Sequence, residues 1–407
     1  MRLTIVNQFY LPDLSPTAHL AASLAEHRAS RGDQVTVVAG SGAYTPGPAA
    51  GAPEGRANPS LRRIWTPSLG KRSTLRRLLD YGVFFSRAGW TLLTLPAQDV
   101  ILLMTTPPYI SLTGILHRLI HRQSRLVLWS MDCYPETLER AGLLRPGSLA
   151  SRGLRGINRW LFRRLDGVVC LDEAMRQLLE QAYGTPDGPR FTVIPNWEPA
   201  AMFPPGSEAP VWEGVTRLGL EGKQVLLYLG NAGAGHRFDT ILQAAARLPA
   251  SEHVFVFVGG GSGWPGLQAA QTSEALANVF LEGYVPKEET PAVLAAADAA
   301  LITLRDEMLG VMSPSKLHAA LAMGLPIVYV GPAGGNVHEA IERFRCGTSL
   351  RHGDSDGLGR FLERLRSEPA WGAELGRRSR LAFETAYSDR VGLARFDALL
   401  DGQRLRS

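Results

Sequence analysis

The feature that most constrains the fold is a repeated alternation of short apolar runs with longer segments of helical periodicity. In the first half of the chain the apolar runs are "RLTIVNQF", "QVTVVAG", "DVILLMT", "RLVLWSMD", "GVVCLDE" and "FTVIPN". Runs that are apolar along their whole length have both faces buried, which is typical of parallel sheets covered by helices. We therefore predict a doubly wound α/β domain, with its first helix at about residues 17–31.

The alternation stops at "WEPAAMFPPGSEAPVWEG", whose prolines and acidic residues indicate an interdomain linker. It restarts with "QVLLYLGN", "HVFVFVGGG", "VFLEGYV", "AALITL" and "IVYVG", and helices are expected at about 238–248, 268–277 and 289–297. A chain of 407 residues also exceeds what one core usually serves. We predict a Rossmann-like domain at 1–200, a second at 201–385, and a helix at 386–407 that packs back toward the first.

Composition is that of a soluble globular protein, with 45% hydrophobic and 20% charged residues. The three cysteines, Cys133, Cys170 and Cys346, lie far apart and form no CxxC pair. This spacing argues against a disulfide framework or a structural zinc site and favours a reducing compartment. The N-terminal residues begin at once with a strand-like run, so no signal peptide is expected.

Positive charge is unevenly placed. Seven basic residues and one acid precede or enter the apolar-aromatic segment "YGVFFSRAGWTLLTLP": Arg62, Arg63, Lys71, Arg72, Arg76, Arg77 and Arg87, against Asp80. This segment and a second one, "SRGLRGINRWLFRRLDG", are predicted to be helices with one apolar and one cationic face. Segment 56–95 suits the rim of an anionic bilayer but is too short to span it, so we expect peripheral membrane association there. The second helix is expected to turn its arginines to water. No nucleic-acid recognition motif accompanies the charge, and no nucleic-acid partner is expected.

A glycine-rich turn in "YLGNAGAGHRFDT" is the first candidate ligand site. Gly230, Gly233 and Gly235 allow close backbone approach between a strand and a helix, where backbone N–H groups can hold a phosphate. His236 or Arg237 could add charge. The spacing differs from the dinucleotide fingerprint GxGxxG, and the alternative is a turn without a ligand. The similar stretch "VGGGSGWPG" could be only a flexible turn.

The second candidate is "GVMSPSKLHAALAMGLPIVYVG". Ser313 or Ser315 can cap a helix that begins at Lys316, and a lysine in a first helical turn is unfavourable for the helix dipole. A residue placed against that preference suggests a bound anion; the alternative is an ordinary surface lysine. Because ligands of doubly wound sheets bind at the carboxyl ends of the strands, the later loop "PAGGN" should lie at the same edge.

Motifs in order along the chain then resemble one family. The stretches "FYLPDLSPTAHLAASLAEHRASRGDQVTVVAG", "LLMTTPPYISLTG", "LVLWSMDCYPETLERAGLL", "VIPNW", "YLGNAGAGH", "GYVPKEETPAVLAAADAALITL" and "SPSKLHAALAMGLPIV" are similar to segments of the GT-B glycosyltransferases of family 4, the group 1 transferases. The likeness is strongest to the branch that builds bacterial exopolysaccharide, colanic-acid and O-antigen units. It implies two Rossmann-like domains with an interdomain cleft, the first binding the acceptor and the second the nucleotide-sugar donor.

The resemblance implies transfer of a hexosyl or N-acetylhexosaminyl group, with retained configuration, from a nucleoside-diphosphate sugar to a hydroxyl. UDP-sugars are favoured over GDP-sugars, and no cofactor or fixed metal ion is expected. The preferred acceptor is a polyprenyl-diphosphate-linked saccharide at the cytoplasmic face of the membrane. A soluble acceptor, a GT-B sugar-nucleotide epimerase and a catalytically silent sugar-nucleotide-binding protein remain alternatives.

Site residues carry over position by position. The catalytic candidates are Asp132, Lys316 and Arg237, and those for the donor phosphates are Gly230, Asn231, Gly233, Gly235, His236, Ser313 and Ser315. The nucleoside and sugar candidates are Tyr284, Val285, His318, Gly334, Gly335 and Asn336, and the acceptor candidates are Ser15, Pro16, Thr17, Tyr109 and Glu136. Asp132 would orient the acceptor hydroxyl or act as a base. Capping a turn is the alternative for Asp132 and Glu136.

The sequence lacks residues that a metal site and the family's donor site would need. His117 and His121 have the i, i+4 spacing of a metal pair but no third ligand, and are expected to be helix-face residues. The family's EX7E glutamates would fall at Val311 and Ala319, so both are absent. The residue that contacts the ribose is therefore left unassigned, with His318 as the neighbouring candidate.

Overall fold

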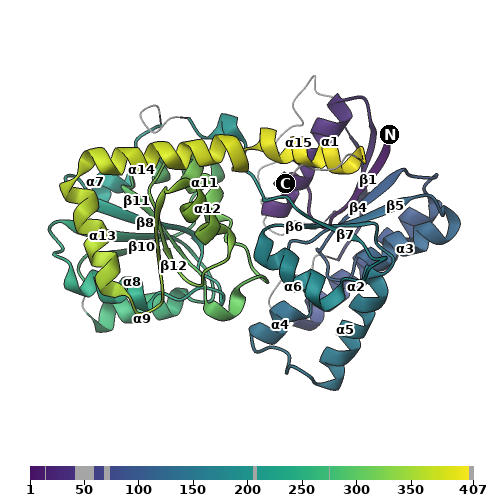
Figure 1. Ribbon diagram of the computed structural model, residues 1–407, viewed down its shortest axis with the longest axis horizontal. Helices are drawn as coiled ribbons and strands as arrows, with labels where there is room; N and C mark the ends of the chain where they lie inside the picture. The colour runs from purple at the N-terminus through teal and green to yellow at the C-terminus, as the bar shows by residue number, and fades with distance from the viewer. Residues whose placement is uncertain (14, 42–58, 68–73, 205–208, 275, 403–407) are drawn as a thin grey trace. The chain divides into compact units, whose positions relative to one another are not determined.

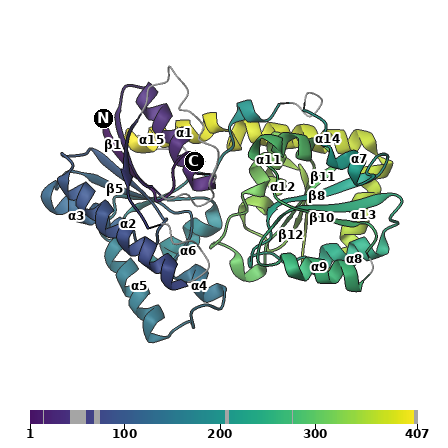
Figure 2. The same ribbon diagram turned by 180° about the vertical axis from the view of Figure 1, so that it is seen from behind.

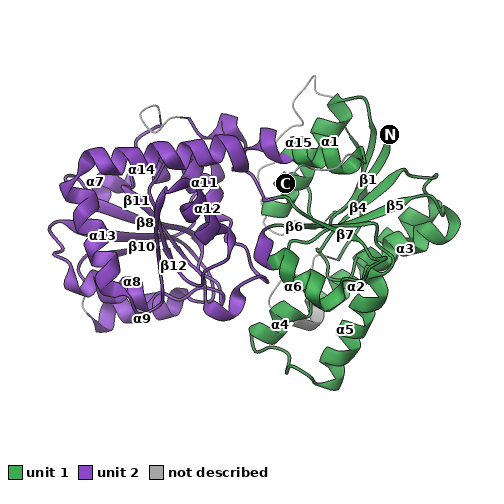
Figure 3. Cartoon of the chain, in the orientation of Figure 1, with its two compact units in different colours: residues 1–171, 175–194, 393–407 green, residues 172–174, 195–392 purple. Residues whose placement is uncertain are grey.

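The computed structural model describes the chain except for residues 14, 42–58, 68–73, 205–208, 275 and 403–407, and the side chains of residues 74–77. The described chain divides into two compact units (Figure 3). Unit 1 contains residues 1–171, 175–194 and 393–407, and unit 2 contains residues 172–174 and 195–392. The chain thus passes into unit 2 shortly before the boundary placed after residue 200 from the sequence, and returns to unit 1 at 393 rather than 386.

Unit 1 is built on a parallel sheet whose strand order in the described residues is β3-β2-β1-β4-β5-β6-β7. Its strands are β1 (Arg2–Val6), β2 (Gln34–Gly40), β3 (Ser60–Ile64), β4 (Val100–Met104), β5 (Arg125–Trp129), β6 (Gly167–Cys170) and β7 (Arg190–Val193). Every residue of β4 and β6 is buried, as expected for strands covered on both faces.

The helices of unit 1 connect these strands. They are α1 (Pro16–Ser30), α2 (Thr74–Thr94), α3 (Ser111–Ile120), α4 (Glu136–Arg140), α5 (Leu149–Phe162) and α6 (Glu173–Tyr183), together with the C-terminal part of α15 (Asp389–Leu400). Helix α1 begins at a proline, and the Ser15 hydroxyl accepts a hydrogen bond from the Ala18 N–H at 3.2 Å. Proline at the first position and serine at the cap are the usual signals of a helix start.

The prediction of one basic helix in segment 56–95 was wrong in its first part. Residues 60–64 form β3, an edge strand paired with β2. Arg62 and Arg63 lie on it, and the Arg63 guanidinium donates to the carbonyl oxygens of Gly40 and Leu11. Charged residues are common on edge strands because they oppose pairing with another chain. Arg56, Lys71 and Arg72 lie outside the described residues.

Unit 2 contains a second parallel sheet, with strand order β10-β9-β8-β11-β12-β13. The strands are β8 (Gln224–Asn231), β9 (His253–Gly260), β10 (Val279–Glu282), β11 (Ala299–Thr303), β12 (Ile327–Val330) and β13 (Gly347–Leu350). The order runs outward in one direction from β8 and in the other from β11. The β8–β11 pair is therefore the topological switch point, where ligands of doubly wound sheets bind.

Helices cover both faces of the second sheet. They are α7 (Gly214–Arg217), α8 (Asp239–Arg247), α9 (Trp264–Ser273), α10 (Thr290–Ala295), α11 (Lys316–Ala322), α12 (Asn336–Phe344), α13 (Ser355–Ser367) and α14 (Pro369–Ala382), with short helical turns at Ala200–Met202, Lys287–Glu289, Asp306–Met308 and Phe383–Tyr387. Figures 1 and 2 show α8 and α9 on one side of the sheet and α11 and α14 on the other. The predicted fold class, two doubly wound α/β domains, is confirmed.

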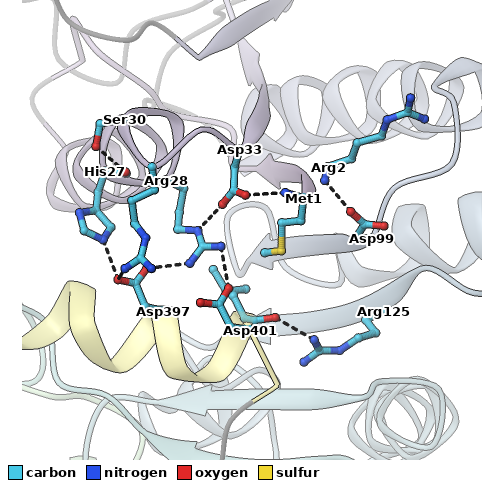
Figure 4. Close-up of polar contacts among 12 residues, drawn as sticks. Met1, Arg2, His27, Arg28, Ser30, Asp33, Asp99, Arg125, Asp397 and Asp401 are labelled. Atoms are coloured by element: carbon cyan, nitrogen blue, oxygen red, sulfur yellow. Dashed lines mark hydrogen bonds and ion pairs between the residues drawn. The ribbon is translucent and has the colours of Figure 1, made fainter.

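The C-terminal helix α15 is held against α1 by a network of charges within unit 1 (Figure 4). The buried Arg28 guanidinium donates to Asp33 at 2.5 Å, to Asp397 at 2.8 Å and to Asp401 at 2.8 Å. Asp397 also accepts from Arg31 at 2.5 Å and contacts His27 Nε2 at 2.9 Å. Asp397 on α15 and Asp401 directly after it are thus fixed to the first helix of the chain, about 370 positions away in sequence.

Candidate functional site

Lys316 is the centre of the strongest site, at the switch point of the second sheet. Its side chain reaches from the start of α11 toward the end of β8, where Nζ donates to the Asn231 carbonyl oxygen at 3.1 Å. The ammonium also lies 4.7 Å from the centroid of the Tyr228 ring, a cation–π contact. Burial lowers the pKa of Lys316 from 10.5 to about 7. The structure shows no carboxylate paired with this ammonium among the described residues.

His236 is the third partner of the Lys316 ammonium. Its Nε2 lies 3.3 Å from Nζ, and its Nδ1 lies 2.6 Å from the Thr303 carbonyl oxygen at the end of β11. Burial and the charge of Lys316 lower the pKa of His236 to about 3, against the raising effect of the Thr303 carbonyl. The imidazole is therefore neutral near pH 7. A partner of this kind was not expected from the sequence, which suggested direct phosphate binding.

The glycine-rich turn brings its backbone close to that of neighbouring loops. Gly230 has φ +123°, and a Cβ atom there would lie 3.4 Å from Cε of Lys316. A side chain at Gly259 would overlap the Gly230 carbonyl group. The Ala232 N–H donates to the Gly260 oxygen at 2.6 Å. The stretch "VGGGSGWPG" is consequently packed against the turn at 230–232 rather than being only a flexible turn.

Arg237 is placed differently from Lys316. Its guanidinium is half exposed and pairs with Asp239 at 2.7 Å. With His236 it lines a polar pocket of about 290 Å³, which Arg305, Asp306, Glu307 and His352 complete. In this structure Arg237 therefore pairs with an acid on its own segment.

The residues before α11 also lie at this edge of the sheet. Ser315 occupies the cap position, but its side chain makes no capping hydrogen bond, so the prediction of a serine cap was wrong in this respect. Asn336 Nδ2 donates to the Pro314 oxygen at 3.3 Å and ties the loop with Gly334 and Gly335 to the segment that holds Ser313 and Ser315. These two predicted groups are thus neighbours in space.

Tyr284 and Val285 follow β10 and lie at the same edge. The Tyr284 side chain is exposed, and its hydroxyl lies 3.4 Å from Asn231 Oδ1. Its ring packs so closely on Gly260 that a Cβ atom at that position would lie 2.9 Å from it. Val285 is half-buried. An exposed aromatic ring beside Asn231 offers a flat apolar surface next to the Lys316 site.

The positions of the two absent glutamates differ in environment. Val311 is fully buried, whereas Ala319 is only partly buried. His318 is buried, its Nδ1 donates to the Ser315 oxygen at 3.0 Å, and its ring packs on Tyr387. His318 Nε2 has no hydrogen-bond partner in the described residues. The ring therefore lies in the interior rather than beside the Lys316 ammonium.

Unit 1 brings two further candidates together. Asp132 follows β5, and its backbone N–H and that of Met131 donate to the Thr105 hydroxyl at 3.1 and 3.0 Å. The Asp132 side chain and Tyr109 line one small cavity. Burial raises the pKa of Asp132. Tyr109 has φ +63°, and its hydroxyl has no hydrogen-bond partner in the part of the chain that the structure describes.

The other acceptor candidates have structural partners. Ser15 caps α1, its hydroxyl lies 3.3 Å from that of Thr17, and Pro16 is the first helical residue. Glu136 is buried, accepts a hydrogen bond from the Tyr183 hydroxyl at 2.5 Å and forms an ion pair with Arg155 at 3.1 Å. The structure therefore places Glu136 in an internal network and not in the cavity that Asp132 and Tyr109 line.

His117 and His121, which have the spacing of a metal pair, bind backbone oxygens instead. His117 Nδ1 contacts the Leu92 oxygen at 2.6 Å and His121 Nε2 contacts the Leu95 oxygen at 3.2 Å, so both rings join α3 to the end of α2. No group of three or more potential metal ligands occurs among the residues that the structure describes.

Several exposed apolar side chains lie along the packed helices α2 and α3 of unit 1. Trp90 on α2 is 70% exposed and Leu119 on α3 is 69% exposed. We call these, with Leu78, Leu79 and Ile120, the α2–α3 patch; Arg87 and Arg122 lie on or just after the same helices. None of the helices in the described part of the chain combines the length and the apolar character that crossing a bilayer requires.

Comparisons with known proteins agree with this architecture. Residues 17–197 match the family described as "Glycosyl transferase 4-like domain", and residues 223–368 match "Glycosyl transferases group 1". The chain is 28% identical to "Probable glycosyltransferase WbjE" of Pseudomonas aeruginosa, over 80% of this chain and 82% of the relative. It is 24% identical to WcaI of Escherichia coli K12, whose name assigns it to colanic acid biosynthesis, over 84% and 86%.

A solved structure shows the same fold. Anabaena HepE, crystallised with UDP-glucose, superposes with a TM-score of 0.73 at 16% identity over 99% of this chain and 100% of that chain. The two doubly wound units have the GT-B fold, and the two family matches make the chain a glycosyltransferase. The chain belongs to the group 1 transferases of glycosyltransferase family 4.

Proposed function

We propose that this glycosyltransferase takes a sugar from a UDP-sugar and transfers it, with retained configuration, to a hydroxyl of a lipid-linked saccharide. The observation that carries the proposal is Lys316, a partly buried cation at the β8–β11 switch point that has only neutral partners among the described residues. A buried ammonium without a carboxylate is costly unless an anion joins it. A donor diphosphate is an anion of the required kind, and UDP-glucose is the ligand of the structural relative HepE.

The chemistry asks the protein to stabilise the leaving diphosphate while positive charge develops on the sugar. The Lys316 ammonium serves the first need, because a preorganised charge in a water-poor site acts strongly on a developing anion. The departing phosphate would help to deprotonate the acceptor hydroxyl, so no protein nucleophile is required. Asp132 orients that hydroxyl or takes its proton. The proposal assigns no role to a fixed metal ion.

The acceptor part of the proposal rests on unit 1. The α2–α3 patch exposes a tryptophan and several leucines beside arginines, which suits the interface of an anionic membrane. Each basic residue near such a surface contributes about 1 kcal/mol. We propose that the protein works at the cytoplasmic face of the membrane, in bacterial surface-polysaccharide assembly, where a polyprenyl-linked saccharide is presented. The name of WcaI is consistent with this pathway class.

Donor binding is tested first. Thermal unfolding of the protein is measured with UDP-, GDP-, ADP- and TDP-sugars, and UDP release is followed with each. We expect stabilisation by UDP-sugars in the native protein and its loss in Lys316→Ala. Equal stabilisation of native protein and variant would refute the assignment of Lys316 to the donor phosphates.

Membrane binding is tested by sedimentation with vesicles. Native protein should bind vesicles that contain phosphatidylglycerol better than pure phosphatidylcholine, and Trp90→Ser with Leu119→Ser should weaken that binding. Leu381→Ser, on an exposed apolar residue of α14, is the matched control. Turnover of a soluble saccharide as fast as that of its lipid-linked form, with no vesicle binding, would favour a soluble acceptor.

A further inference from the structure

His236 is fixed in one tautomer by its surroundings. Its Nδ1 lies 2.6 Å from the Thr303 carbonyl oxygen, which can only accept, so Nδ1 must carry the proton. In the neutral ring Nε2 is then a bare acceptor, and Lys316 Nζ lies 3.3 Å from it. The histidine therefore accepts a hydrogen bond from the lysine and has no N–H on that side to offer to a phosphate.

The ring is also held in place by packing. Its centroid lies 5.7 Å from that of Tyr228, edge to face, and 6.3 Å from that of Phe238. The same Tyr228 ring lies against the Lys316 ammonium, so one tyrosine supports both members of the pair. Thr303 is fixed in turn, because its hydroxyl donates to the Arg237 oxygen at 2.7 Å. Strand β11 thereby sets the position of a side chain in the loop after β8.

We propose that His236 is a positioning residue that holds the Lys316 ammonium for the donor diphosphate, and that it does not contact the phosphates itself. The inference rests on the proposed function, because it takes Lys316 as the cation of the donor site. Two of the three Lys316 N–H groups are occupied by His236 Nε2 and the Asn231 oxygen. One N–H is left for the ligand, and its direction is set by the other two.

Geometry explains why a neutral imidazole suits this role. A carboxylate at the same place would form a salt bridge with the lysine and compete with the diphosphate for it. A protonated imidazole would repel the ammonium at 3.3 Å. The low pKa of His236, about 3, keeps the ring neutral throughout the physiological range. The charge that acts on the ring is that of Lys316. The pocket that His236 lines also holds Arg305, Asp306, Glu307 and Arg237, whose guanidinium pairs with Asp239.

Two substitutions separate positioning from simple structural support. In His236→Asn the side-chain amide can still donate to the Thr303 oxygen but is too short to reach Lys316. In His236→Gln the amide oxygen can accept from Lys316 while the bond to Thr303 is lost. Dissociation constants for UDP and for uridine, which lacks phosphates, are measured by calorimetry for both variants, for native protein and for Lys316→Ala, with thermal unfolding as a check on folding.

We expect His236→Asn to weaken UDP binding by about 10- to 100-fold, the usual effect of losing a hydrogen bond to a charged group, and to leave uridine binding unchanged. His236→Gln should retain UDP affinity within a few-fold. The inference is overturned if the asparagine variant binds UDP as well as the glutamine variant, or if UDP and uridine are weakened equally. If Lys316→Ala itself retains native UDP affinity, it is the proposed function that fails.

Discussion

Arg28 should contribute far more to the stability of unit 1 than Arg31, although both donate to the same carboxylate. Arg28 is 3% exposed and binds three aspartates, whereas the Arg31 side chain is 50% exposed and binds one (Figure 4). Removing one partner of a buried ion pair costs about 3–5 kcal/mol, since the other charges stay buried. An exposed pair contributes about 0–1 kcal/mol.

The variants are Arg28→Met and Arg31→Met, which keep the volume of the aliphatic stem. For a unit of this size each kcal/mol shifts the midpoint by roughly 2–4 °C, so Arg28→Met should lower the unfolding temperature of unit 1 by roughly 6–20 °C. Arg31→Met should lower it by no more than about 4 °C. Scanning calorimetry measures both, and limited proteolysis should release α15 earlier in Arg28→Met. Equal effects of the two substitutions would refute the reasoning.

Acid provides an independent check on this network. The pKa of Asp397 lies below its usual range. Burial alone would raise this pKa, but the hydrogen bonds from His27 and Arg28 and the nearby positive charge together lower it by more. A carboxyl group with a depressed folded pKa contributes stability above its unfolded pKa, which is about 3.9, and loses it as pH falls through the folded pKa. The difference between native protein and Arg28→Met should therefore be constant near neutral pH and shrink below about pH 4.

Three further predictions concern catalysis. UDP affinity should fall as pH rises above about 7, because the Lys316 pKa is about 7 and only the charged form attracts the diphosphate. Calorimetry from pH 6 to 9 measures this affinity, and an affinity that does not change with pH would contradict the prediction. Asp132→Asn should lower kcat/KM by about 10²–10⁴-fold and leave UDP affinity unchanged. Burial raises the pKa of the Asp132 carboxyl, so the activity of the native protein should rise with pH through that pKa. Chelation by EDTA should leave transfer unaffected, since Lys316 supplies the charge assigned to the leaving group; loss of activity restored by Mg²⁺ would contradict this.

Much of the architecture could be predicted from the sequence because the buried interior strands consist almost entirely of apolar residues. Val100–Met104 is apolar throughout and Ala299–Thr303 is apolar up to its last residue, and all of their residues are buried. The strand at Ser60–Ile64 was missed because it lies at the sheet edge, where four of its five residues are exposed and two are arginines. Such a strand lacks the apolar signal that identifies an interior strand.

The site was predicted less well than the fold because partner choice depends on distances that a sequence does not contain. His236 and Arg237 are adjacent and both basic, yet one accepts from Lys316 and the other pairs with Asp239. Tyr228, which supports the lysine, belongs to a buried strand and could not be distinguished there from a core residue. His318 has a polar side chain next to Lys316, but the turn of the helix places it in the interior.

The low pKa of Lys316 has a consequence for how the donor is held and released. Because burial brings the pKa of Lys316 to about 7, part of the ligand-free protein carries a neutral lysine near neutral pH, and apparent donor binding is weakened by that fraction. The neutral fraction grows as pH rises, and apparent donor binding weakens with it. Where the lysine is neutral, binding of the diphosphate is coupled to uptake of a proton there, and the proton is given back when UDP leaves. Placing a cation among neutral partners thus ties product release to pH, whereas a carboxylate partner in place of His236 would hold the lysine charged at all physiological pH values and remove this dependence.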